Sequence, residues 1–168
     1  PKALQEISNL TAEKIVAMYD SVHHVRSIML RLTNIYGPRA QMKHPRYGVV
    51  NWFVRLAIDD ETIQVFGDGQ IIRDFLYVDD CIDALIQCAL CDDAYGHVFN
   101  VASGVPLNFR TLAESLIDVA GSGRWEFAPF TPERAAQEPG DFYADVSKIA
   151  RIVGWAPRIA LREGIERT

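Results

Sequence analysis

Two polar side chains lie in apolar surroundings where contact with a ligand is chemically reasonable. Asn34 directly follows the apolar run VRSIMLRL at 25–32, which predicts a buried strand. Ligands of open α/β sheets bind beyond the carboxyl ends of strands, so the Asn34 amide can donate to a ligand there. The alternative is a turn in which this side chain bonds its own backbone. Arg73 lies inside the strand pattern IIRDFLYV. Its guanidinium either pairs with Asp74 or Asp79 or is aimed at a phosphate or carboxylate.

The remaining chemically active side chains have no spacing typical of a catalytic or metal site. Arg134 lies in a proline-bounded segment with Glu133 and Glu138 and, taken alone, is predicted to be a solvated surface residue. Cys88 and Cys91 have CxxC spacing, but no second pair and no nearby His accompanies them. This favours reduced thiols on a helix face over a metal or redox site. The sequence has no Ser-His-Asp spacing and no phosphate-binding glycine loop.

The composition limits the classes of function. The 168 residues carry a net charge of −5 without a dominant Lys/Arg cluster, which argues against a nucleic-acid partner bound through its phosphates. No apolar run reaches the roughly 18 to 20 residues that a membrane helix needs, and the sequence predicts no signal peptide. With 49% hydrophobic residues and cysteines predicted to be reduced, we expect a cytoplasmic globular protein that is not bound to a membrane.

The elements that must position these residues alternate between helix and strand. The pattern predicts helices at 6–21, 48–60, 79–93, 109–121, 146–154 and from 161 onward, and strands at 25–32, within 61–78, at 97–103 and at 125–130. The segments 33–48 and 132–141 are predicted loops, and Gly67-Asp68-Gly69 is a predicted turn between two short strands. Asp79 and Asn108 are predicted N-caps, and Gly121 and Gly154 predicted helix ends. The alternation indicates an α/β fold.

Four segments of the chain together carry a family resemblance. They are LRLTNIYGPR at 30–39, QVFGDGQIIRDFLYVDDCIDAL at 64–85, VFNVASG at 98–104 and GDFYADVSKIARIVGWAPRIALREGI at 140–165. In this order they resemble the carboxyl-terminal half of the extended short-chain dehydrogenase/reductases that act on nucleotide sugars, the UDP-hexose 4-epimerases and sugar-nucleotide 4,6-dehydratases. The resemblance implies a partial Rossmann-type sheet, with its last strands and helices only, plus the small mixed α/β substrate-binding domain.

The resemblance also implies a division of the chain and roles for several residues. Residues 1–36 would be what remains of the dinucleotide-binding domain, and 37–168 would be mainly substrate-binding, with 78–120 returning to the Rossmann-type sheet. The implied ligand is a nucleoside-diphosphate sugar. Its binding residues are, by resemblance, Asn34, Arg73 and Arg134 at the diphosphate and Val65 and Phe66 on the strand that lines the base. Two guanidiniums and an amide are a chemically reasonable clamp for a dianionic diphosphate.

Two departures from the family pattern concern catalysis. The Gly-rich dinucleotide motif has no counterpart here, so we expect this chain alone to bind no cofactor, although the family uses NAD. Aligning Ser8 with the family's catalytic helix places Gln5 and Asn9 at the Tyr and Lys positions of the Tyr-x-x-x-Lys motif. A phenol beside an ammonium can exchange a proton with a sugar hydroxyl, whereas a carboxamide does not titrate. We therefore expect no catalytic residue, and the sequence leaves open whether the chain is an enzyme.

Three hypotheses follow from this combination. The chain is a truncated, NAD-dependent epimerase/dehydratase-like protein that keeps the nucleotide-sugar-binding half and is inactive alone. Alternatively, it is a stand-alone nucleotide-sugar-binding module, or a non-catalytic protein that self-associates. The helix at 5–22 has an apolar stripe that includes Leu10, Ile15 and Met18, and the resemblance places this helix at a dimer interface. We therefore expect a homodimer or a higher assembly through this helix.

Overall fold

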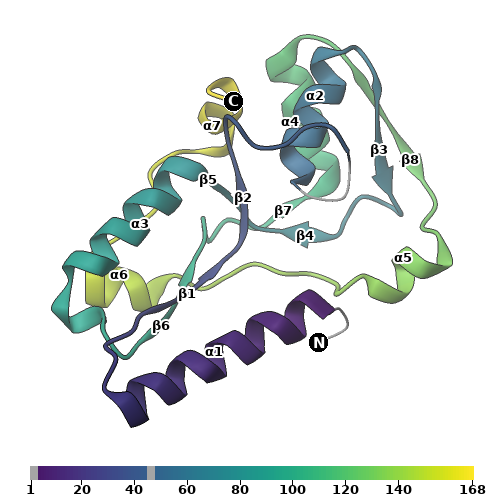
Figure 1. Cartoon of the computed structure of the whole chain (residues 1–168). Coiled ribbons are helices and arrows are strands. Elements are labelled where there is room, and N and C mark those ends of the chain that lie inside the picture. Colours follow the sequence, from purple (N-terminus) through teal and green to yellow (C-terminus); the bar gives the residue numbers. More distant parts are fainter. Residues whose placement is uncertain (1–3, 45–47) are drawn as a thin grey trace.

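The computed structural model describes residues 4–44 and 48–168, apart from the side chain of Gln5. The helices are α1 (Leu4–His23), α2 (Val49–Ile58), α3 (Val78–Leu90), α4 (Phe109–Ala120), α5 (Pro132–Gln137), α6 (Ser147–Val153) and α7 (Leu161–Glu166), with a 3-10 turn η1 (Asp92–Ala94) (Figure 1). The strands are β1 (Met29–Leu32), β2 (Asn34–Tyr36), β3 (Thr62–Phe66), β4 (Ile72–Arg73), β5 (Phe75–Tyr77), β6 (Val98–Val101), β7 (Leu107–Asn108) and β8 (Arg124–Ala128).

The strands pair across long stretches of sequence. β1 and β6 run parallel, with Met29 opposite Val98, and β2 and β5 run parallel, with Asn34 opposite Phe75. β3 and β8 are also parallel, whereas β4 and β7 are antiparallel. The two strands predicted around Gly67-Asp68-Gly69 exist as β3 and β4, but they pair with β8 and β7 and not with each other. Parallel pairs joined by helical crossovers confirm the predicted α/β class.

Buried side chains gather in two clusters on either side of the β2–β5 pair. The first cluster lies where α2 and α4 pack on β3, and it includes Phe75 and Tyr77 of β5. The second lies around α3, α6 and β6 and includes Leu76 of β5 and Trp155. Successive side chains of a strand point to opposite faces, so β5 contributes to both clusters. The predicted domain division between residues 36 and 37 stays a prediction.

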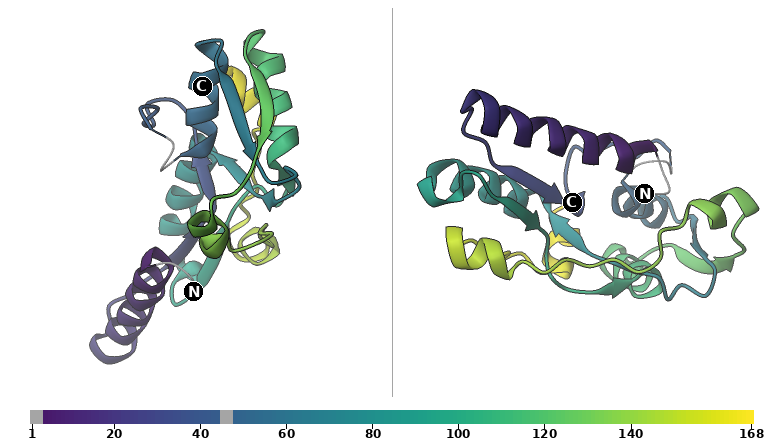
Figure 2. Two further views of the ribbon diagram at one scale, coloured as in Figure 1. Left: turned by 90° about the vertical axis from the view of Figure 1, so that its right-hand side faces the viewer. Right: turned by 90° about the horizontal axis from the view of Figure 1, so that it is seen from below.

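Helix α1 lies along one edge of the molecule and packs little against the rest of the chain. Figure 2 shows that it projects away from the other elements in the left-hand view. Two carboxylates of α1 bind the rest of the chain. Glu13 accepts hydrogen bonds of 2.9 and 2.6 Å from Arg31 on β1, and Asp20 accepts a hydrogen bond of 2.7 Å from Ser27 Oγ. Hydrogen bonding to Arg31 lowers the pKa of Glu13. No helix among the described residues combines the length and apolarity needed to cross a bilayer.

The predicted helix ends of α4 and α6 are confirmed. Asn108 Oδ1 accepts a 2.8 Å bond from the backbone amide of Thr111, as expected of an N-cap. Gly121 and Gly154 follow the last helical residues with φ of 69° and 79°, the left-handed conformation in which glycine ends a helix without a Cβ clash. These signals depend on neighbouring residues only, so the sequence suffices to find them.

Four local predictions are wrong. The strand predicted at 25–32 is confined to 29–32, and β2 lies inside the predicted loop at 33–48 because it pairs with β5, forty residues away in sequence. Asp79 does not cap α3, since β5 runs directly into that helix and Tyr77 is the N-cap residue. The predicted loop at 132–141 contains α5, which Thr131 caps by accepting a bond from the Arg134 amide, with proline in the first helical turn.

Candidate functional site

The described residues form a pocket of about 410 Å³ between α2, β3 and α5. Its walls are mostly aromatic and aliphatic, and its charged lining residues are two carboxylates and one guanidinium. The lining residues are Val49, Trp52, Phe53, Leu56, Glu61, Thr62, Gln64, Val65, Phe66, Ile71, Phe109, Phe130, Arg134 and Glu138. This size and mixture are typical of a pocket for a small organic ligand.

Three of the predicted site residues meet in this pocket: Val65, Phe66 and Arg134. The Arg134 guanidinium carbon lies 4.0 Å from the centroid of the Phe66 ring, and the Phe66 and Phe130 rings lie 5.7 Å apart. The Val65 side chain is 1% exposed and belongs to the core, whereas Phe66, next along the strand, is only half-buried. The Thr131 cap fixes the start of α5 and thereby holds Arg134 over the ring.

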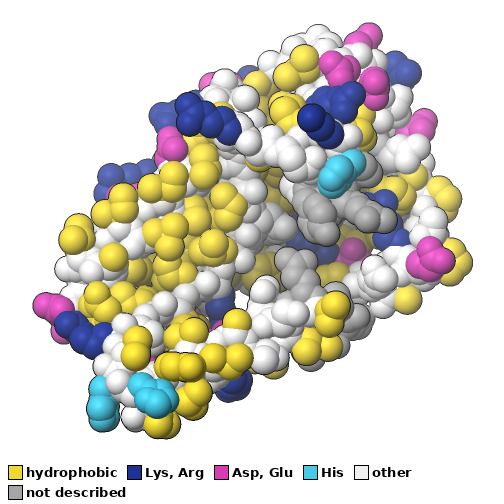
Figure 3. Space-filling view, in the orientation of Figure 1, with side chains coloured by type: hydrophobic (Ala, Val, Ile, Leu, Met, Phe, Trp, Pro, Cys, Tyr) yellow, Lys and Arg dark blue, Asp and Glu magenta, His cyan; other side chains and the backbone are white. Residues whose placement is uncertain are grey.

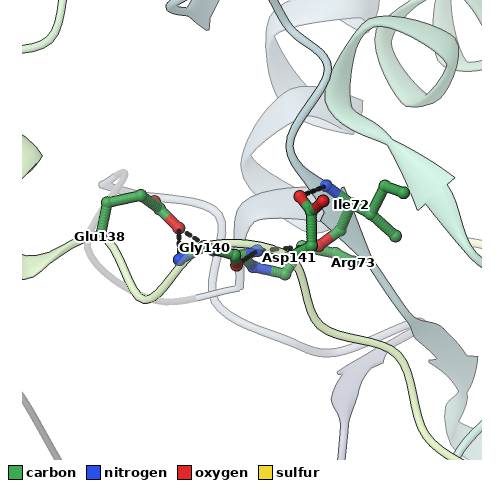
Figure 4. Close-up of polar contacts among 5 residues, drawn as sticks. All are labelled: Ile72, Arg73, Glu138, Gly140 and Asp141. Atoms are coloured by element: carbon green, nitrogen blue, oxygen red, sulfur yellow. Dashed lines mark hydrogen bonds and ion pairs between the residues drawn. The ribbon is translucent and has the colours of Figure 1, made fainter.

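Arg73 lies behind this pocket and is held by the segment that follows α5. Its Nη1 donates to the carbonyls of Ile72 at 2.8 Å and Gly140 at 2.6 Å, and its Nη2 forms an ion pair with Glu138 Oε1 (Figure 4). Of the two alternatives for Arg73, the ion pair with Asp74 or Asp79 is therefore wrong, and its role at a diphosphate stays a prediction. Arg73 does not line the pocket, but its partner Glu138 does.

Asp74 cannot form an ion pair with Arg73, because the two side chains point to opposite faces of the extended segment. Successive side chains of an extended segment alternate between faces, so Asp74 enters the interior while Arg73 turns toward α5. The Asp74 carboxylate is fully buried and accepts from Ser103 N at 2.8 Å, Ser103 Oγ at 2.7 Å, Gly104 N at 3.0 Å and Ala144 N at 3.4 Å. It therefore fastens two distant loops to the end of β4, a structural role that the sequence did not indicate.

Asn34 lies apart from the pocket. It begins β2, where its backbone N–H and its side-chain Nδ2 both donate to the Asp74 carbonyl, at 3.3 and 3.0 Å. Its side chain is otherwise exposed. The predicted turn in which Asn34 bonds its own backbone is wrong, because the partner carbonyl belongs to the segment between β4 and β5. The binding role of Asn34 stays a prediction.

Gln5 and Asn9, which the resemblance aligns with the family's Tyr and Lys positions, lie on α1, four residues apart. The side chain of Asn9 is exposed, and the prediction for the side chain of Gln5 lies outside the described residues. Within the described part of the chain, no group of three or more His, Cys, Asp and Glu side chains could hold a metal ion.

The helix N-termini that follow strands are poorly suited to a dinucleotide pyrophosphate. The first turn of α3 carries Asp79 and Asp80, whose charges oppose an anion. At α4 the Thr111 amide is already taken by the Asn108 cap. The described residues thus do not fit the pyrophosphate of NAD at either helix.

Sequence reasoning missed several lining residues, above all Glu138 and the aromatic pair Trp52 and Phe130. Glu138 lies in a segment without regular structure and its partner Arg73 is sixty-five residues away, so no local spacing could reveal the pair. Phe130 ends a predicted strand pattern and carries no signal for a ligand-facing position. These contacts are set by tertiary packing.

Comparisons with known proteins identify relatives of this chain. A UDP-glucose 4-epimerase of Mycolicibacterium smegmatis is 30% identical over 171 residues, which cover 100% of this chain and 52% of that protein. The crystal structure of a UDP-glucose 4-epimerase of Thermotoga maritima with UDP-glucose superposes with a TM-score of 0.84 at 25% identity, covering 96% of this chain and 50% of that one. The crystal structure of a UDP-glucuronic acid 4-epimerase of Bacillus cereus, in complex with UDP-glucuronic acid and NAD, has a TM-score of 0.81 at 26% identity. The similarity covers 94% of this chain and 48% of that one.

The chain therefore spans about half the length of the relatives that it matches. Its residues 6–102 match the sequence model of the NAD dependent epimerase/dehydratase family. This match covers more than half of the chain, and the similar folds agree with the resemblance found in its motifs. The chain belongs to the NAD dependent epimerase/dehydratase family.

Proposed function

We propose that this chain binds the nucleoside-diphosphate part of a nucleotide sugar in the pocket between α2, β3 and α5. The observation that carries the proposal is the placement of the Arg134 guanidinium 4.0 Å over the Phe66 ring at the pocket wall. Aromatic rings offer flat surfaces to a base, and a guanidinium offers forked donors to a phosphate. UDP-glucose in the Thermotoga maritima relative supports this ligand class.

Calorimetry with UDP-glucose and dTDP-glucose tests the proposal. We expect heat of binding with at least one of them and an affinity lowered about tenfold in Arg134→Gln, which removes a charge-assisted contact. Arg110→Gln is the matched control, because Arg110 also lies over a ring, that of Trp125 at 5.5 Å, yet does not line the pocket. Absence of heat with both nucleotide sugars contradicts the proposal.

We further propose that the chain alone neither holds NAD nor runs the family's oxidation step. Gln5 and Asn9 cannot exchange a proton near neutral pH, and the starts of α3 and α4 do not favour a pyrophosphate. When bound, NAD would accept a hydride from the sugar, and the carboxamides of Gln5 and Asn9 are not suited to remove the accompanying proton. An epimerase assay with UDP-galactose and added NAD tests this, and measurable turnover contradicts it.

A second property that we propose is self-association through α1 and α3. The α1 side chains of Ile7, Leu10 and Ile15 are 45–50% exposed, and on α3 Leu85 and Leu90 are 46% and 82% exposed. Figure 3 displays hydrophobic side chains spread over the face that contains α3 and along α1. Contiguous apolar surface of this kind is typical of an interface.

Sedimentation velocity at low micromolar concentration tests self-association. We expect a dimer or larger species for the natural chain and a monomer for the Leu10→Glu/Ile15→Glu variant, because two buried carboxylates would oppose the contact. Lys14→Glu serves as the control, since Lys14 is an exposed polar residue of the same helix. A natural chain that sediments as a monomer contradicts the proposal.

A further inference from the structure

The segment after α5 is fastened to β4 at two consecutive residues. Asp141 Oδ1 accepts from Ile72 N at 2.9 Å, and Phe142 N donates to Ile72 O at 3.0 Å. The Gly140 carbonyl accepts from Arg73 at 2.6 Å, and Gly140 N donates to Glu138 Oε1 at 3.2 Å. Figure 4 shows the Glu138 carboxylate turned back along the segment toward Gly140 and Arg73. One carboxylate oxygen therefore accepts from both the guanidinium and its own segment.

This arrangement places a negative charge between the pocket and the buried guanidinium. The side chains of Arg73 and Glu138 are only 12% and 24% exposed, so water screens their ion pair less than it screens a surface pair. Glu138 lines the pocket and Arg73 does not. A phosphate that enters the pocket thus meets the carboxylate first and must compete with it for the guanidinium.

The other charges along the described pocket wall do not offset this effect. Glu61, Arg134 and Glu138 are its ionisable lining residues, and together with Arg73, the partner of Glu138, their formal charges sum to zero. Like charges at short range in a partly buried site repel by amounts that change affinity severalfold. The pocket as it stands therefore offers a diphosphate no net positive charge.

We propose that Glu138 is a specificity-determining residue that competes with an anionic ligand for Arg73. The inference rests on the proposed nucleotide-binding function and adds a selectivity to it. With Glu138 in place, Arg73 adds little to the affinity for a nucleoside diphosphate over the bare nucleoside. Neutralising Glu138 frees Nη2 of Arg73 for a phosphate oxygen, while Nη1 keeps its bonds to the Ile72 and Gly140 carbonyls.

The test compares UDP with uridine, which lacks phosphate, by calorimetry on the full chain. Glu138→Gln keeps the shape and one accepting oxygen of Glu138, and we expect it to bind UDP about tenfold more tightly than the natural chain. Its affinity for uridine should change by less than about twofold. Glu133→Gln is the matched control, because Glu133 lies on α5, is exposed and does not line the pocket.

Arg73→Gln, made alone and together with Glu138→Gln, completes the comparison. With it, the test does not rest on the correct folding of a single variant. In the natural background it should lower UDP affinity by less than about twofold, whereas in the Glu138→Gln background it should remove most of the gain. Equal UDP affinity of Glu138→Gln and the natural chain overturns the inference and leaves the proposed function standing if uridine binds. If neither UDP nor uridine binds the natural chain or Glu138→Gln, both the inference and the proposed function are wrong.

Discussion

Gly164 in α7 lies against two buried tyrosines, and we predict that Gly164→Ala destabilises the fold. A Cβ atom at this position would lie 2.1 Å from Tyr36 Oη, 2.9 Å from Tyr36 Cζ and 3.0 Å from Tyr77 Cδ2. Tyr36 is 2% exposed, and its hydroxyl donates to the Leu161 carbonyl at 3.3 Å. The ring has no free space to enter, so either α7 or the tyrosine must shift.

The expected cost follows from three contributions. Overpacking a core typically destabilises by about 1–3 kcal/mol. Loss of the Tyr36 hydrogen bond to Leu161 adds about 1 kcal/mol, whereas alanine regains up to about 1 kcal/mol of helix propensity over glycine. We therefore expect the free energy of unfolding to fall by about 1–3 kcal/mol, which lowers Tm by roughly 3–10 °C for a chain of this size.

Urea unfolding of four proteins measures this: the natural chain, Gly164→Ala, Tyr36→Phe and the double variant. Tyr36→Phe deletes the oxygen that the new Cβ would meet at 2.1 Å, so Gly164→Ala should cost less in that background. We expect a coupling of at least about 1 kcal/mol between the two substitutions. A Gly164→Ala variant as stable as the natural chain, or strictly additive costs, would refute the packing argument.

Three further predictions concern buried ionisable groups. Asp74→Asn should destabilise by about 2–4 kcal/mol in urea unfolding, because an amide cannot accept all of the bonds made by the carboxylate; a change below about 1 kcal/mol would count against this. Burial raises the pKa of the Cys81 and Cys88 thiols, so a thiol reagent should label the half-buried Cys91 first and all three cysteines only after unfolding; rapid labelling of the folded chain at all three would be inconsistent with the structure. Burial, and then the charges of neighbouring groups, raises the pKa of Tyr36 above its ordinary value of about 10, so the folded chain keeps this proton longer than the unfolded chain. Its contribution to stability is therefore present below about pH 10 and is lost as the pH rises further. Between about pH 10 and 12 the free energy of unfolding of Tyr36→Phe should fall less steeply than that of the natural chain, and identical slopes would contradict this.

The sequence predicted the features that depend on neighbouring residues. The Asn108 cap and the left-handed Gly121 and Gly154 lie beside the helix ends that they mark. The start of α5 has a similar local signal, Thr131 followed by proline, although this segment was predicted to be a loop. The family motifs indicated the fold class, and the comparisons confirm the family. The cytoplasmic location stays a prediction.

The partners of the candidate site residues depend on contacts between distant segments, and these were not predictable. For Arg73, both an ion pair with Asp74 or Asp79 and a contact with a phosphate or carboxylate were open, and the partner in the structure is Glu138, which reaches it from beyond α5. Asn34 was placed in a loop, because β2 pairs with β5 only when the intervening segment with α2, β3 and β4 is folded. Charge and residue type thus identified which side chains could do chemistry, whereas tertiary packing decided which of them meet.

Two features of this chain act in the same physical direction. If Gln5 and Asn9 stand at the family's Tyr and Lys positions, as the resemblance predicts, carboxamides there supply no positive charge to attract a phosphate or to lower a pKa. At Arg73 the Glu138 carboxylate neutralises a second positive charge. The aromatic wall and Arg134 are unaffected by either change. If nucleotide affinity persists, it must therefore come mainly from the base and from one guanidinium, and it should depend only weakly on how many phosphates the ligand carries.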